Sequence, residues 1–244
     1  MVQLLRTRLI FCVVVGFGGA PACQTTFPPG TQNDIERIIT WTWVGGMSDT
    51  RAVVVSQIQN EAPAMIVEAD NLQRRTIRPG YASSAGERKL WRFELNGLRA
   101  GTRYRYSFVR SDGTLIDKVE RSFRTFPAPG KPSSFRFIVS SCAEKTNSSV
   151  FTAALRHRLL FFLHTGDFYY SKIKHNDAAM FRMAFHTHLR APQLSAMLCS
   201  VPLLYMWDDH DFGRNDSNRA TPTREAALEA YRKIVPHFPF AHAG

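Results

Sequence analysis

A dense group of acidic residues and one histidine stands in the segment MWDDHDFGRND, which runs from residue 206 to residue 216. It follows the apolar stretch VPLLY at residues 201–205, which is typical of a buried strand. Carboxylates placed this closely repel one another and lose hydration when buried, so something must compensate them. A bound metal ion would do so, and a helix N-terminus or a solvated loop are the structural alternatives.

Two earlier apolar runs also end in polar residues. FRFIV at residues 135–139 leads into SSC, which ends at Cys142, and LLFFLH at residues 159–164 leads into TGDFYY, which holds Asp167 and Tyr170. Sites in open parallel sheets lie beyond the carboxyl ends of the strands, so we expect these groups to converge. A thiolate and a phenolate among oxygen and nitrogen donors suit an oxidised transition metal, with a hard cation such as calcium beside it.

Two different sequence patterns follow each other along the chain, and they predict the elements that would position these residues. Before residue 126, segments such as IITWTWV, AVVVSQI and LWRFEL read as short strands separated by Gly and Asn-Gly turns. In LRAGTRYRYSF, a corner Tyr whose hydroxyl bonds back to the preceding backbone is typical of a β-sandwich, and the stretch resembles fibronectin type III domains. We predict an N-terminal β-sandwich of the fibronectin III or Ig-like kind at residues 33–126, followed by a Pro-rich linker.

After the linker, apolar strand segments alternate with helical ones such as DAAMFRMAFHTHL and TPTREAALEAYRKIVP. This alternation predicts a layered α/β domain with a mainly parallel sheet over residues 134–244.

The first 22 residues predict an export signal. MVQLLRTRLIFCVVVGFGGAPAC contains two arginines, then an apolar run, then Ala-Pro-Ala, which is the order of a cleaved signal peptide. The apolar run is too short to span a bilayer comfortably. We therefore expect an exported protein that is periplasmic, secreted or held at the cell envelope by a lipid on Cys23, where the mature chain would begin.

Charge limits the classes of ligand that the chain would bind, and cysteine content limits the kinds of metal site and disulfide it could contain. The 244-residue chain carries a formal net charge of +11, and it stays basic when Arg6 and Arg8 leave with the signal. No block of five like charges and no nucleic-acid-binding motif occurs, so we expect the basic surface to gather small anionic substrates. We also expect the chain to be a monomer. The sequence has four cysteines and no C-x-x-C, which argues against a zinc knuckle. Cys142 and Cys199 either pair with each other or stay unpaired.

The segment GDFYY followed by WDDHDFGRND, after a strand-terminal SSC and behind a fibronectin-like domain, resembles the alkaline phosphatase D (PhoD-like) family of metallophosphoesterases. The resemblance covers roughly residues 33 to 244, and Asp208-Asp209 stand where the wider superfamily has Gly-Asn. It implies an α/β metallophosphoesterase-type layered domain, Fe³⁺ and Ca²⁺ as cofactors, and hydrolysis of small phosphate mono- and diesters.

The resemblance also implies a role for each matching residue. Cys142 would bind a ferric ion as thiolate and Tyr170 as phenolate, while Asp167 would hold the metal ions together. Asp209 would fill the ligand position that Asn takes elsewhere in the superfamily, and His210 would contact the phosphate and protonate the leaving oxygen. The implied set is thus His210 and Asp209 as catalytic residues and Cys142, Asp167, Tyr170, Asp209 and Asn215 as metal ligands, with Asp208 and Asp211 fixing the loop and Tyr169 packing.

The family pattern continues beyond what this sequence carries. Further Asp and His ligands are expected from later strands, whereas this sequence finishes at VPHFPFAHAG. We therefore expect an incomplete metallophosphoesterase domain, and two functions stay open. The first is metal-dependent hydrolysis of phosphate esters, which His210→Ala would abolish. The second is a non-catalytic exported binding module or pseudoenzyme remnant, whose partner binding would survive Asp167→Asn and Asp209→Asn.

Overall fold

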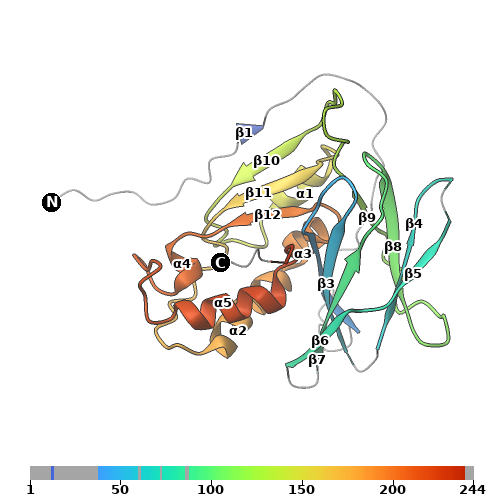
Figure 1. Ribbon diagram of the computed structural model, residues 1–244. Coiled ribbons are helices and arrows are strands. Elements are labelled where there is room, and N and C mark those ends of the chain that lie inside the picture. The colour runs from blue at the N-terminus through green and yellow to red at the C-terminus, as the bar shows by residue number, and fades with distance from the viewer. Residues whose placement is uncertain (1–11, 14–37, 60–61, 72, 86–87, 240–244) are drawn as a thin grey trace.

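The computed structural model describes residues 12–13, 38–59, 62–71, 73–85 and 88–239 (Figure 1). The expected export signal lies outside the described residues except for Cys12–Val13, and so does Cys23. The described strands are β1 (Cys12–Val13), β2 (Ile39–Gly45), β3 (Ala52–Gln59), β4 (Ala64–Glu68), β5 (Arg75–Ile77), β6 (Tyr81–Ala85), β7 (Arg88–Leu95), β8 (Arg103–Val109), β9 (Arg121–Arg124), β10 (Phe137–Ser140), β11 (Phe161–Thr165) and β12 (Leu203–Met206). The described helices are α1 (Ser149–Leu155), α2 (Ala178–Leu189), α3 (Pro192–Leu198), α4 (Asp209–Phe212) and α5 (Arg224–Ile234).

The larger of two sheets carries the predicted parallel strands. Its strand order is β1-β10-β11-β12-β2-β3-β7-β6, and β10, β11 and β12 run parallel, as the alternation of strands and helices predicted. The sheet does not stop at the Pro-rich linker, because β12 also pairs in parallel with β2, where Leu203 is the partner of Gly45. Strands from both halves of the chain therefore form one continuous sheet.

The smaller sheet has the order β5-β4-β8-β9 and packs against β2, β3 and β7 of the larger sheet. Buried apolar side chains from both sheets fill the space between them, and the rings of Phe93 in β7 and Phe108 in β8 lie 5.4 Å apart. The architecture is thus mixed α/β with two sheets (Figure 1). The domain boundaries and the fibronectin-like kind of the N-terminal part stay predictions.

Two tyrosines of β8 fix the smaller sheet in place. Tyr104 accepts a hydrogen bond on its hydroxyl from the backbone N of Arg99 at 2.8 Å, the corner arrangement that the sequence predicted. Tyr106 donates its hydroxyl to the carbonyl oxygen of Cys199 at 2.6 Å, at the C-terminal end of α3. The thiol of Cys199 is buried and that of Cys142 is exposed, and both are free.

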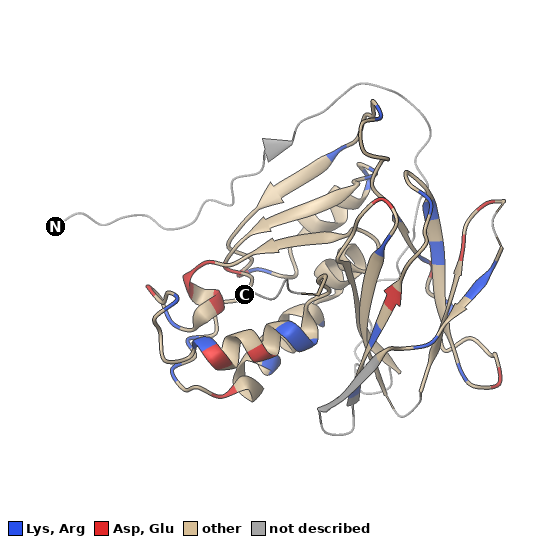
Figure 2. Ribbon diagram, viewed as in Figure 1, with Lys and Arg blue, Asp and Glu red and all other residues tan. Residues whose placement is uncertain are grey.

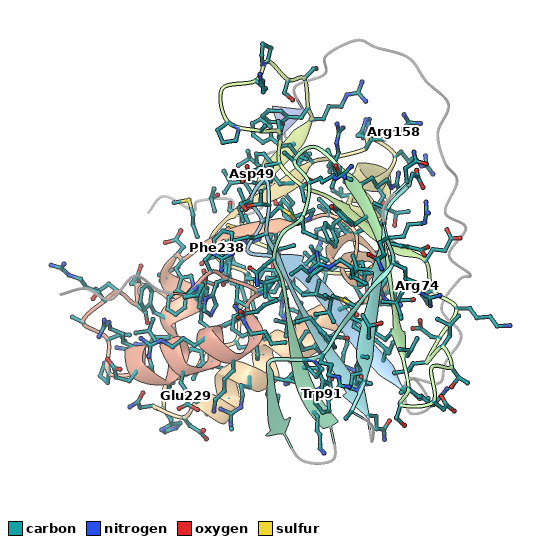
Figure 3. The ribbon with its side chains drawn as sticks, turned by 45° about the vertical axis from the view of Figure 1, so that its right-hand side comes forward. Asp49, Arg74, Trp91, Arg158, Glu229 and Phe238 are labelled. Atoms are coloured by element: carbon teal, nitrogen blue, oxygen red, sulfur yellow. The ribbon has the colours of Figure 1, made fainter. Side chains whose placement is uncertain are left out.

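Helices α2 and α5 lie beside each other and cover the parallel strands (Figure 1). Both occur where the sequence predicted helices, and α5 turns Ala226, Ala227, Ala230 and Ile234 inward. Glu229 on the outer side of α5, labelled in Figure 3, accepts from Arg182 of α2 at 3.4 Å and from Lys233 at 2.7 Å. None of the described helices combines the length and apolarity needed to cross a membrane.

One histidine lies in the core beneath the strand ends. His164 in β11 is 0% exposed, and within the described part of the chain neither of its ring nitrogens has a hydrogen-bond partner. Phe162, Phe168 and Tyr205 surround the ring edge-on. Burial, with a smaller effect from His188, lowers the pKa of His164 to about 4, since the charged form would lose its hydration.

His164 should therefore make the fold sensitive to acid. An unfolded His binds its proton near pH 6.5 whereas folded His164 does so only near pH 4, so stability is lost as pH falls between these values. The loss amounts to about 3 kcal/mol at pH 4. Denaturant unfolding of His164→Leu from pH 7.5 to 4 should show a shallower decline than wild type.

The matched control is His175→Ala, which removes an exposed histidine and should leave the decline unchanged. Equal acid sensitivity of wild type and His164→Leu would contradict this account of the buried imidazole.

Candidate metal centre

The segments that follow β10, β11 and β12 meet at one edge of the sheet. The backbone N of Cys142 donates to the carbonyl oxygen of Gly166 at 3.1 Å, and the N of Ala143 donates to that of Asp167 at 2.9 Å. The backbone N of Asp167 in turn donates to the Asp211 carboxylate at 2.7 Å. The three strand ends therefore converge, as their position in a parallel sheet predicted.

Donor atoms gather where the strand ends meet. One ligand atom from each of Asp167, Asp209 and His210 lies within 4.8 Å of the others. The Tyr170 hydroxyl donates to Oδ2 of Asp167 at 2.8 Å, and Sγ of Cys142 lies 3.8 Å from the same oxygen. Five of the six residues that the sequence singled out for metal binding or catalysis thus lie together, with four of them around the carboxylate of the fifth, Asp167.

The electrostatics of this group fit a bound cation. Burial raises the pKa of Asp167, and the charge of Asp209 raises it further, while burial and the contacts with Cys142 and Asp167 raise the pKa of Tyr170. Nδ1 of His210 is buried and has no hydrogen-bond partner among the described residues, and its ring lies 4.3 Å from that of Tyr170. A cation would offset the carboxylate repulsion and favour the deprotonated oxygens, so these residues fit a metal ion.

The Asp211 carboxylate holds the segments of the site together. It is 1% exposed and accepts hydrogen bonds from the backbone N of Asp167 at 2.7 Å, of Phe168 at 3.0 Å and of Asp208 at 2.9 Å, and from the hydroxyl of Tyr205. Burial raises the pKa of Asp211 to about 6, although these bonds favour its ionised form. Asp208 caps α4, so both aspartates fix the loop as expected.

Gly166 permits the close approach of two of these segments. Its φ is +106°, and a Cβ placed on it would lie 2.4 Å from Cβ of Asp208 and 2.7 Å from the Asp208 backbone N. Any other residue would therefore push the β11 and β12 ends apart. Cys142 and Asp167 also have positive φ, at 60° and 57°, which is costly for residues other than glycine and is often found at functional sites.

Asn215 and Tyr169 lie outside the group of donors. The exposed Asn215 donates its amide to the carboxylate of the adjacent Asp216, so its role as a metal ligand stays a prediction. Tyr169 is 1% exposed and packs edge-on against Phe185 with ring centroids 4.9 Å apart, as expected for a packing residue.

One contact at the site was not predicted from the sequence. The backbone N of Asp216 donates to Oδ2 of Asp209, which fixes that side chain from a later loop. Asp216 has a φ of 63°, a backbone conformation that Asp and Asn adopt more readily than most residues. The Asn-Asp pair within GRND is a sequence signal for a turn at this position.

Two solved structures have a similar fold. One is described as the structure of PhoD, with a TM-score of 0.64 and 17% identity, over 84% of this chain and 46% of that chain. The other is the purple acid phosphatase PPD1 from yellow lupin (Lupinus luteus) seeds, with a TM-score of 0.60 and 13% identity, over 82% of this chain and 40% of that chain. This chain thus spans less than half the length of either.

No protein-family model matches the sequence, and no curated protein matches it. At these identities the two structural neighbours show a shared fold, and they agree with the coarser part of the expected fold, a mixed α/β architecture with two sheets.

Replacing Asp211 should lower the free energy of unfolding, because its carboxylate holds the turns that carry the site. In Asp211→Asn one oxygen becomes an amide donor that faces backbone N–H groups, so at least one buried donor loses its acceptor. We expect a loss of about 2–4 kcal/mol in the free energy of unfolding. Denaturant titration would measure it, with Asp177→Asn as the control, since Asn caps a helix as well as Asp does. Equal stability of the two variants would contradict the role assigned to Asp211.

Proposed function

We propose that this chain carries the metal centre of a phosphate-ester hydrolase of the alkaline phosphatase D (PhoD-like) type. The observation that carries the proposal is the convergence of Asp167, Asp209 and His210 within 4.8 Å at the carboxyl ends of parallel strands. The fold supports it, because one structural neighbour is described as PhoD and the other as a purple acid phosphatase.

The residues divide into two groups around Asp167. Sγ of Cys142 and the hydroxyl of Tyr170 both contact Oδ2 of Asp167. These two residues and Asp167 would hold a ferric ion, since thiolate and phenolate suit an oxidised transition metal. Asp209 offers hard oxygens and would hold Ca²⁺ beside it, with Asn215 as a further oxygen ligand. When bound, such cations neutralise phosphate oxygens and lower the pKa of an attacking water.

His210 is held for proton transfer. Its backbone N donates to Oδ1 of Asp209 at 2.9 Å and lies 3.3 Å from Oδ1 of Asp167, which fixes the residue at the start of α4. The imidazole packs on the Tyr170 ring and is buried, so it has little freedom to turn away. In this position it would contact the phosphate and donate a proton to the leaving oxygen.

The substrate would be a small phosphate ester, and the chain would act as an exported monomer. The basic net charge of +11 favours collection of anionic substrates, and the fibronectin-like residues 33–126 would support the site through the shared sheet. Amino-terminal sequencing of the mature protein tests the export, with a start near Cys23 expected and an intact Met1 as the contrary result.

Hydrolysis of bis(p-nitrophenyl) phosphate by the purified chain, supplied with iron and calcium, tests the function. We expect chelator-sensitive turnover, and a loss of about 100-fold or more in kcat/KM in His210→Ala, because the leaving oxygen then lacks its proton donor.

The matched control is His157→Ala, which removes an exposed histidine after α1 and should keep wild-type turnover. Turnover that survives both the chelator and His210→Ala would overturn the proposal, and so would a folded, metal-loaded chain that hydrolyses no ester.

Tyr170 offers a test of the metal that does not depend on activity. If Tyr170 binds ferric ion as phenolate, the iron-loaded chain should show a visible phenolate-to-iron absorption band, and Tyr170→Phe should lose it. Tyr169→Phe is the control, because that hydroxyl instead lies 3.4 Å from the carbonyl oxygen of Asp211. A band that is identical in the wild type and Tyr170→Phe would rule out this ligand.

A further inference from the structure

A hollow of about 540 Å³ opens in the loop between α4 and α5. Residues of this one loop line it, and most of them carry polar side chains. They are Arg214, Asn215, Asp216, Ser217, Asn218, Ala220, Thr221 and Pro222. Asn215 is the one lining residue that also has a role in the proposed metal centre.

The loop is held in shape by its own hydrogen bonds. The backbone N of Arg214 donates to Oγ of Ser217 at 3.1 Å, and the backbone N of Ser217 donates to the carbonyl oxygen of Arg214 at 3.1 Å. Further along, the backbone N of Thr221 donates to the carbonyl oxygen of Asn218 at 2.9 Å. A ligand in the hollow would therefore meet a loop backbone that is already ordered, which lowers the entropy lost on binding.

The hollow adjoins the metal centre. Asp216 lines it, and the backbone N of Asp216 donates to Oδ2 of Asp209, one of the three convergent donors. In Figure 2 the acidic residues of α4 and the basic residues of the following loop lie next to each other at the same end of the molecule. A substrate whose phosphate lies at Asp209 would thus extend toward the hollow.

The polar groups of the hollow suit an anion. Within the described residues, the Arg214 guanidinium forms no ion pair with a carboxylate, whereas the carboxylate of Asp216 already accepts the amide of Asn215. A guanidinium can bind a phosphoryl group through two parallel hydrogen bonds, and the Asn218 amide and Thr221 hydroxyl add further donors. The Arg214 guanidinium therefore offers positive charge next to a centre that would bind the scissile phosphate, in a hollow that the Asp216 carboxylate also lines.

We propose that this hollow binds a second phosphoryl group of the substrate, with Arg214 as the residue that determines this specificity. The proposal rests on the proposed function and deepens it, because it names the substrate class as a small phosphate ester that carries a further phosphate. A substrate of this class would span the metal centre and the hollow together.

Propane-1,3-diphosphonate and propylphosphonate form a matched pair of probes, since they differ by one phosphonate and their C–P bonds resist hydrolysis. Calorimetric titration into the metal-loaded chain measures both dissociation constants. We expect the diphosphonate to bind about tenfold or more tightly than the monophosphonate, because a charge-assisted hydrogen bond contributes about that factor. In Arg214→Ala the two probes should bind equally tightly. Arg219→Ala is the control, because it removes the same charge from the same loop outside the hollow and should keep the ratio.

The outcomes separate this proposal from the function on which it rests. A wild-type ratio near one, or an equal loss in both variants, would overturn the hollow as a phosphoryl site even if ester turnover is found. If the ratio of the two dissociation constants depends on Arg214 but the chain hydrolyses no ester, the hollow is supported as a phosphoryl site. The proposed hydrolase function is then overturned. Thermal unfolding of both variants would verify that these exposed loop changes leave the fold intact.

Discussion

A single buried carboxylate, that of Asp211, accepts hydrogen bonds from the turn after β11, from the turn after β12 and from the hydroxyl of Tyr205. The positions of Asp167, Asp209 and His210 all depend on it, because it fixes the backbone on both sides of the group. A carboxylate accepts only, and here the bonds from Asp167 and Phe168 come from backbone donors that would otherwise be buried without a partner. The backbone around the site is therefore held mainly by Asp211, which is not one of the groups proposed to bind metal.

The continuous sheet gives this arrangement its support. β12 lies between β11 and β2, so the strand that leads into Asp208 is flanked by a strand from each half of the chain. The pairing is close at Gly45, where an added Cβ would lie 2.8 Å from Pro236 and 3.1 Å from the carbonyl oxygen of Leu203. The N-terminal strands thus help to position the site without contributing a donor to it.

The strand ends were predictable because local patterns determine them. Apolar runs that end in Cys142, Asp167 and Asp209 indicate strand termini, and parallel strands bring their carboxyl ends to one edge. The corner hydroxyl of Tyr104 followed from the same kind of local signature. The pairing of β12 with β2 was not predictable, since no local pattern reports which distant strand a given strand joins. The bond from Asp216 to Asp209 was also missed, because it depends on the path of a loop that carries no periodicity.

The shared sheet also bears on how the chain folds. The Pro-rich segment after residue 126 looks like a hinge between independent units, yet Leu203 pairs with Gly45 and Tyr106 bonds to Cys199 across it. Cutting the chain there would leave β2 and β12 each with an unpaired edge, and such edges promote aggregation. Contacts between residues this distant in sequence also form late and slowly. The two halves should therefore lose their structure together, as one cooperative unit, and neither should fold well without the other.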